Sequence, residues 1–311
     1  MIKSVEDVSP VRRYRGLISG KPGVRKTSTA MTAPRPLLVD TDRGIHRVEA
    51  RYRKGAYIQP ASYEEVLSDL DKNNPMLADF DTIVLDTGGT LLDLMKPWAI
   101  AQAAKNGQKD GRTLSQQGYG AVGNEFARLM EYIAVTLFKH VIVIFHAKED
   151  KDGENTRFLL AIEGKMKNAI WNTMDFGFFM EPQGKDILCG FAPTERYDAK
   201  RTRGLPEVMK LPTSDPDARF LTDVFALLDK SMAEDLEHAK RYNASLNEAR
   251  DVIDSINSPE TATEAIEKMK NIEYFGESYA AAKTLFGRKV AFLGLVYDEK
   301  TKAYANKEVQ A

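Results

Sequence analysis

Runs of apolar residues punctuate about the first 200 residues of the chain, separated by segments with helix signals. The runs are continuous rather than alternating in polarity, which is typical of strands buried on both faces of a parallel sheet. Parallel neighbours need crossover connections, usually helices, so the pattern predicts an α/β fold with a mostly parallel sheet flanked by helices. The predicted strands are residues 16–19, 37–39, 82–85, 141–145, 176–180 and 187–191.

The segments between these strands favour helices. Small residues follow the first strand, Ser62 can cap a helix whose third residue is Glu65, and apolar residues recur at helical spacing after residue 125. A polar, glycine-containing segment, 104–118, is expected to be a loop. The predicted helices are residues 28–32, 62–72, 91–100 and 125–138.

The chain changes in character after about residue 230. Residues 231–273 are rich in Glu, Lys, Ala and Asp with helical periodicity, and Ser258-Pro259 is a typical helix start. We therefore expect a main domain at 1–230 and a small, mainly helical C-terminal appendage at 231–311.

Composition excludes several classes of function. The formal net charge is -1, which excludes a chain-wide basic field for nucleic acid but not a local groove. The single cysteine, Cys189, excludes an intrachain disulfide and a cysteine-based zinc site. No apolar run is long enough to span a membrane and the first residues do not resemble a signal peptide, so we expect a cytoplasmic protein.

A glycine-containing turn between the first strand and the first helix approaches the phosphate-loop pattern G-x-x-x-x-G-K-[ST]. Such a turn directs main-chain N–H groups at a phosphate; Lys26 would reach the β- and γ-phosphates of ATP, and Thr27 would hold Mg²⁺. An ordinary strand–turn–helix is the alternative. The predicted nucleotide-binding residues are Gly20, Lys21, Pro22, Gly23, Val24, Arg25, Lys26, Thr27 and Ser28.

Arg25 departs from this pattern, because it stands where the second glycine is expected. Glycine at that position permits dihedral angles that cost other residues free energy, and it lets a phosphate approach closely. The arginine side chain can point outward and leave the loop open, or it can occlude the site. The sequence leaves both alternatives open.

Polar residues at predicted strand ends complete the candidate catalytic set. Asp86 would hold Mg²⁺ together with Thr27, unless it is a turn or cap residue. Asp40 and Asp42 are both candidates to activate water, with Asp42 preferred; a loop salt bridge is the alternative. His146 follows a strong apolar run and is a candidate γ-phosphate sensor ahead of a loop, or a strand-end residue with no role.

A basic cluster, Lys200, Arg201 and Arg203, lies further along the chain. It can contact a neighbouring subunit's nucleotide or the phosphates of nucleic acid, and a solvated turn is equally compatible with it.

The segments GLISGKPGVRKT, LLVDTDRG, DTIVLDTGGTLLDLM, LSQQGYGAV, VIVIFHAKED and YDAKRTRGLP follow one another in an order similar to that of one family. Over about residues 10–230 the chain resembles phage-encoded P-loop nucleotide-binding proteins with a RecA-like AAA core, which include ATP-dependent single-strand annealing proteins. The resemblance implies Asp86 as the Walker B carboxylate, Asp42 as the catalytic carboxylate in place of Glu, His146 as a sensor, and a basic pair within 200–203 that reaches across a subunit interface.

Two functions remain open at this point. One is an ATP-hydrolysing, homo-oligomeric phage protein that acts on single-stranded DNA in recombination or replication, in the host cytoplasm. The other is a nucleotide-binding switch or interaction protein with weak or no hydrolysis, favoured by Arg25. A small-molecule kinase is a weaker third alternative.

Overall fold

The computed structural model describes residues 13–105, 114, 116–152, 155–162, 166–212 and 219–306. These residues divide into two compact units, the first ending at Ser231 and the second starting at Met232. In the described part of the chain, no helix is long and apolar enough to cross a membrane.

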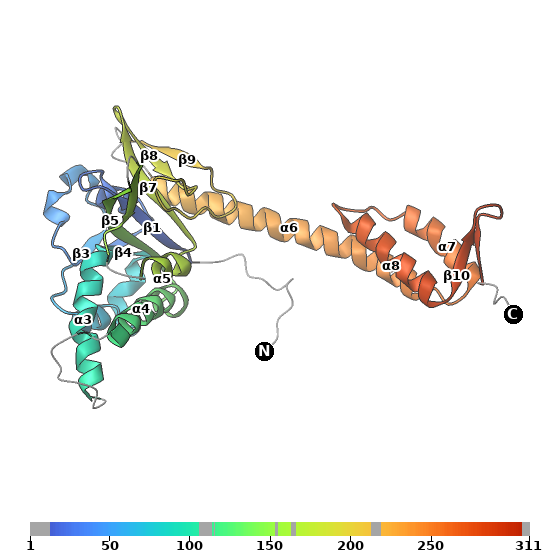
Figure 1. The fold of residues 1–311 in the computed structure, drawn as a ribbon, viewed down its shortest axis with the longest axis horizontal. Coiled ribbons are helices and arrows are strands. Elements are labelled where there is room, and N and C mark those ends of the chain that lie inside the picture. The colour runs from blue at the N-terminus through green and yellow to red at the C-terminus, as the bar shows by residue number, and fades with distance from the viewer. Residues whose placement is uncertain are drawn as a thin grey trace. The chain divides into compact units, whose positions relative to one another are not determined.

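The first unit is built on a nine-stranded sheet in the order β3-β2-β4-β5-β1-β7-β8-β9, with β6 paired to β5 (Figure 1). The pairings from β3 through β7 are parallel, and those of β7 with β8, β8 with β9 and β5 with β6 are antiparallel. The strands are β1 (Arg15–Gly20), β2 (Pro36–Asp40), β3 (Ala56–Ile58), β4 (Thr82–Asp86), β5 (His140–Asp152), β6 (Asn155–Leu160), β7 (Phe176–Gln183), β8 (Asp186–Gly190) and β9 (Val208–Leu211).

Helices cover both faces of this sheet. One face packs on α2 (Tyr63–Asp69), α3 (Gly88–Lys105), α4 (Gln116–Glu131) and α5 (Met166–Thr173), in a single apolar cluster with alternate residues of β1, β4 and β5. On the other face, Phe176 and Phe178 of β7 meet Phe225 and Phe220 of α6 (Phe220–Asp254). The predicted fold class, a mostly parallel sheet flanked by helices, is confirmed.

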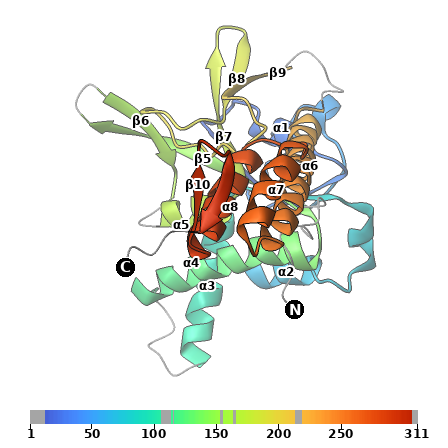
Figure 2. The same ribbon diagram turned by 90° about the vertical axis from the view of Figure 1, so that its right-hand side faces the viewer.

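The second unit contains the last part of α6, α7 (Pro259–Lys270), α8 (Ser278–Phe292) and a hairpin of β10 (Leu295–Asp298) and β11 (Ala303–Asn306) (Figure 2). Its apolar core joins residues of all three helices to Leu295. Ser258 caps α7 with its side chain, as its sequence predicts.

Two local predictions were wrong. The chain does not leave the sheet at His146: β5 continues to Asp152 and pairs antiparallel with β6, so the expected loop is a hairpin. The expected loop 104–118 is helical at both ends, because α3 extends to Lys105 and α4 begins at Gln116; residues 106–113 and 115 lie outside the described residues.

Candidate nucleotide-binding site

The carboxyl ends of four adjacent parallel strands bring the predicted site residues to one edge of the sheet. Asp40 of β2 lies beside Asp86 of β4, and Gly20 of β1 lies beside His146 of β5. A cavity of about 560 Å³ opens at this edge, lined by the turn after β1 and by Asp42, Asp86 and His146. Crevices at the carboxyl ends of strands are where open α/β sheets bind ligands.

The turn after β1 leads into α1 (Lys26–Ala30), and it positions Lys26 at the wall of the cavity. The Lys26 side chain is buried, and its ammonium donates to the carbonyl oxygens of Gly20 at 3.0 Å and Lys21 at 2.8 Å. Burial lowers the pKa of Lys26 to about 8, against the attraction of Asp86 and Asp42. The loop therefore holds its lysine ready beside the cavity.

Arg25 adopts the left-handed conformation, with φ 63° and ψ 29°, that the phosphate-loop pattern reserves for glycine. Its guanidinium lies 4.0 Å from a Glu49 carboxylate oxygen and 5.6 Å from the centre of the Tyr52 ring. Glu49 and Tyr52 also line the cavity. The Arg25 side chain therefore lies along the wall of the cavity, beside Glu49 and Tyr52.

Thr27 and Asp86 form the direct link between the turn and β4. The Thr27 hydroxyl donates to Asp86 Oδ2 at 2.5 Å. Burial raises the pKa of Asp86 to about 6, and the nearby Asp42 and Asp40 add to this, whereas the Thr27 hydrogen bond and Lys26 oppose it. A hydroxyl oxygen and a carboxylate oxygen this close together are suitable ligands for Mg²⁺, which prefers hard oxygen ligands and keeps several waters.

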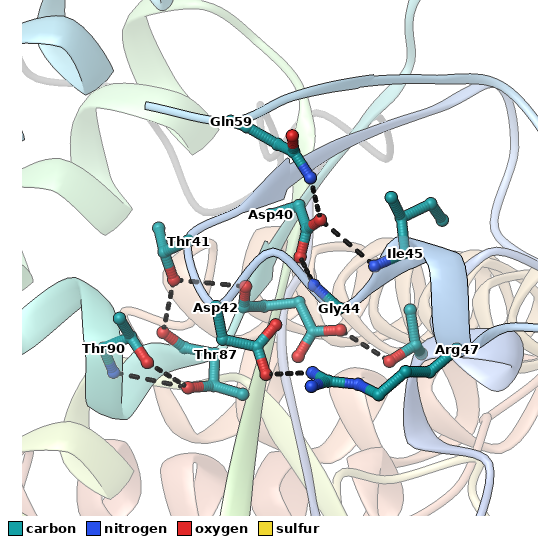
Figure 3. Close-up of polar contacts among 11 residues, drawn as sticks. Asp40, Thr41, Asp42, Gly44, Ile45, Arg47, Gln59, Thr87 and Thr90 are labelled. Atoms are coloured by element: carbon teal, nitrogen blue, oxygen red, sulfur yellow. Dashed lines mark hydrogen bonds and ion pairs between the residues drawn. The ribbon is translucent and has the colours of Figure 1, made fainter. Parts of the chain in front are cut away.

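Asp40 and Asp42 have different environments although they are two residues apart (Figure 3). Both carboxylate oxygens of Asp40 accept hydrogen bonds within the fold, from the main-chain N–H groups of Gly44 and Ile45 and from the Gln59 amide. Asp42 Oδ2 accepts from Arg47 at 2.6 Å, while its Oδ1 is buried and has no hydrogen-bond partner among the described residues. Asp42, unlike Asp40, lines the cavity.

His146 also lines the cavity, and no group in the described part of the chain forms a hydrogen bond with its buried Nδ1. Burial lowers the pKa of His146, and the positive charge of Lys26 lowers it further, which favours the neutral imidazole. Beyond His146, the β5–β6 hairpin touches the phosphate-loop turn: the Lys21 ammonium lies 2.5 Å from Glu149 of β5 and 4.9 Å from the centre of the Phe158 ring of β6.

The basic cluster does not line this cavity. The Lys200 ammonium donates to the carbonyl oxygens of Trp171 and Met174 at the end of α5. Arg201 pairs with Glu207 at 3.0 Å, and Arg203 is exposed.

Sequence reasoning missed the cavity wall formed by the two short 3₁₀ helices Ile45–Arg47 and Ala50–Tyr52 and the residues between them. This wall carries Arg47, Glu49 and Tyr52. The available signal was the density of charged and aromatic residues directly after Asp42.

A family model described as an AAA domain matches residues 12–203. No curated protein matches the chain in sequence.

Several solved structures are similar in fold at low sequence identity. The RadB recombinase is 15% identical with a TM-score of 0.40, covering 64% of this chain and 86% of that one. A second structure, described as an ATPase domain, is 10% identical with a TM-score of 0.41, covering 67% of this chain and 84% of that one. The flagellar accessory protein FlaH from Methanocaldococcus jannaschii is 10% identical with a TM-score of 0.33, covering 57% and 76%.

Proposed function

Because this chain belongs to the AAA domain family, with its nucleotide-binding P-loop core, we propose that it hydrolyses ATP with Mg²⁺. One observation carries the proposal: a single cavity brings together the phosphate-loop lysine, the Thr27–Asp86 pair and a buried, unpaired carboxylate oxygen of Asp42. These are the groups that phosphoryl transfer to water needs: a cation for the phosphates, oxygen ligands for the metal and a base.

The first step is capture of the triphosphate. Lys26 exchanges its two loop carbonyls for phosphate oxygens, and the N–H groups of the turn that leads into α1 face the same phosphates. Thr27 and Asp86 are the residues that would hold Mg²⁺, Asp86 through water; the bound ion supplies charge neutralisation at the phosphates.

The second step is activation of water. Asp42 Oδ1 accepts a proton from the attacking water, whose oxygen bonds to the γ-phosphorus as the bond to the ADP oxygen breaks. The neutral His146 orients that water or a γ-phosphate oxygen through its unpaired Nδ1. Asp40 holds the turn that carries Asp42, through Gly44 and Ile45, and takes no part in the chemistry.

We assign this chemistry to the domain 1–230 and treat 231–311 as an attached module. The resemblance of the ordered motifs supports the biological setting that we propose: a homo-oligomeric phage protein that uses ATP on single-stranded DNA in recombination or replication, in the host cytoplasm. Within 200–203, we assign the basic pair that reaches across a subunit interface to Arg201 and Arg203. Both are exposed, whereas the carbonyl oxygens at the end of α5 hold the Lys200 ammonium.

One observation favours a nucleotide-binding switch as the second candidate. Arg47 forms a 2.6 Å ion pair with Asp42, the proposed base. If that pair persists with nucleotide bound, the carboxylate stays neutralised, water is not activated and ATP is bound without turnover.

The test is ATP binding and hydrolysis with and without single-stranded DNA. Lys26→Ala should abolish ATP binding, and its matched control is Lys210→Ala, which removes an exposed lysine of β9 that pairs with Asp186 and does not line the cavity. Unchanged ATP affinity of Lys26→Ala would remove the phosphate-site assignment. DNA-stimulated turnover supports the first candidate, and binding without turnover supports the switch.

A further inference from the structure

Charge is segregated along the second unit. Residues 232–277 contain eleven acidic and five basic residues, whereas residues 278–306 contain five basic and two acidic ones. Helix α8 has three basic residues and no acidic one. Among the described residues of this unit, an acidic part is thus followed by a helix and a hairpin with a net positive charge.

The residues of α8 divide into a buried and an exposed side. Ser278, Ala282 and Val290 are buried, and the last two belong to the unit's apolar core. Positions 279, 280, 283, 284, 287, 288, 291 and 292 recur at helical spacing on the opposite side, and all are exposed. The exposed side is therefore a continuous stripe along the whole helix.

Basic and aromatic side chains share this stripe. Within the part of the chain that the structure describes, neither Lys283 nor Arg288 forms an ion pair with a carboxylate. Tyr279 is 56% exposed and Phe292 is 85% exposed, one at each end of α8. In the hairpin that follows, Tyr297 is 42% exposed, and Lys300 and Lys302 lie in its turn.

Surfaces that bind single-stranded nucleic acid combine two kinds of side chain: cations that follow the backbone phosphates and aromatic rings that stack on the bases. The exposed side of α8 has both. Duplex DNA hides its bases, so it would not cover Tyr279 or Phe292. A hydrophobic protein partner would cover the rings but leave the cations without carboxylates. The stripe from Tyr279 to Phe292 is about 20 Å long at the helical rise of about 1.5 Å per residue.

We propose that the exposed side of α8, with the adjoining hairpin, binds single-stranded DNA through Lys283, Arg288 and Phe292. This inference rests on the partner proposed above and not on ATP turnover. It places a DNA-binding surface outside the nucleotide cavity, on the unit that the family match at 12–203 does not cover.

The experiment measures binding of a fluorescein-labelled oligodeoxythymidylate, about 30 nucleotides long, to the full chain by anisotropy, without nucleotide, at several KCl concentrations. Each phosphate contact with a single strand contributes about -0.7 to the slope of log affinity against log salt. Lys283→Ala/Arg288→Ala should therefore lower the magnitude of that slope by about 1.4 and weaken binding roughly 25-fold at about 0.1 M KCl. Phe292→Ala should weaken binding about fivefold or more, through lost stacking.

The matched control is Lys268→Ala/Lys270→Ala, which removes two lysines of α7 that already pair with Glu264 and Glu267. It should change affinity less than about threefold, because each of these lysines has a carboxylate partner and neither belongs to the α8 stripe. Wild-type affinity and slope in the α8 variant, an equal loss in the control, or a change in sedimentation that reveals self-association through this stripe would each overturn the proposal. ATP affinity should be unchanged in both variants, so a failure here is separate from a failure of the ATP site.

Discussion

Replacing Arg25 by glycine restores the phosphate-loop pattern, and the structure predicts what this does to stability. A non-glycine residue in the left-handed region costs about 1–2 kcal/mol, which Arg25→Gly relieves. Against this, glycine loses about 0.5–1 kcal/mol more backbone freedom on folding. The lost contact with the Tyr52 ring contributes about 0.5–1 kcal/mol, and the partly exposed 4.0 Å pair with Glu49 contributes little. The contributions nearly cancel, so the free energy of unfolding should change by less than about 1 kcal/mol.

The effect on ATP is expected to be larger and to run against the restored pattern. The guanidinium lies on the cavity wall, where its positive charge would attract the phosphates of ATP. A unit charge about 6 Å from a phosphate, at an effective dielectric constant of about 40, contributes about 1.4 kcal/mol, or about tenfold in Kd. Arg25→Gly should therefore weaken ATP binding by up to about tenfold.

Titration calorimetry with ATP and Mg²⁺, together with thermal unfolding, measures both quantities. Arg51→Ala is the control, because Arg51 contacts the same Glu49 and Tyr52 but does not line the cavity. It should leave ATP affinity unchanged. Binding that becomes about tenfold tighter in Arg25→Gly would refute the reasoning, since it would mean that the arginine blocks the loop.

Three further predictions concern the carboxylates and Lys26. Asp42→Asn should abolish turnover but keep ATP binding, whereas Asp40→Asn should lower the melting temperature by disturbing the turn that Asp40 holds; the reverse pattern in ATPase and melting assays would exchange their roles. Asp86→Asn should stabilise the fold at pH 7, because holding a carboxylate of pKa about 6 ionised, against an ordinary 3.8, costs up to about 3 kcal/mol, a cost that disappears progressively as pH falls below 6. Urea unfolding at about pH 5 and pH 7 tests this, and equal gains at both would contradict it. The profile of kcat/KM should rise through about pH 6, as Asp86 ionises, and fall through about pH 8, as Lys26 loses its proton; a flat profile between about pH 5 and 9 would argue against both groups.

The central strands could be predicted from the sequence because each is an apolar run buried on both faces. Residues 82–85 and 141–145 are of this kind, and both are strands in the sheet. The β5–β6 hairpin could not be predicted in this way, because residues 147–152 are mostly charged. Beyond His146, β5 pairs only with β6. A strand with one neighbour and an exposed surface has no continuous apolar pattern.

The site divides in the same way. Asp86 and Lys26 followed from local patterns at a strand end and a turn. The difference between Asp40 and Asp42 did not, because it depends on contacts made in the folded chain: Asp40 accepts from two main-chain N–H groups of the following turn and from Gln59, 19 residues away. The direction of the Arg25 side chain likewise depends on Glu49 and Tyr52, which approach it only once the chain has folded.

Because β5 is continuous, a movement at the nucleotide cavity can be transmitted along this strand to the β5–β6 hairpin. His146 is the last residue of β5 that pairs with β1, and the strand runs on from it without a break. A small shift of the His146 imidazole when phosphate is released would produce a larger displacement at the far end of the hairpin. The ion pair between Lys21 of the turn after β1 and Glu149 of β5 would limit the displacement of the hairpin.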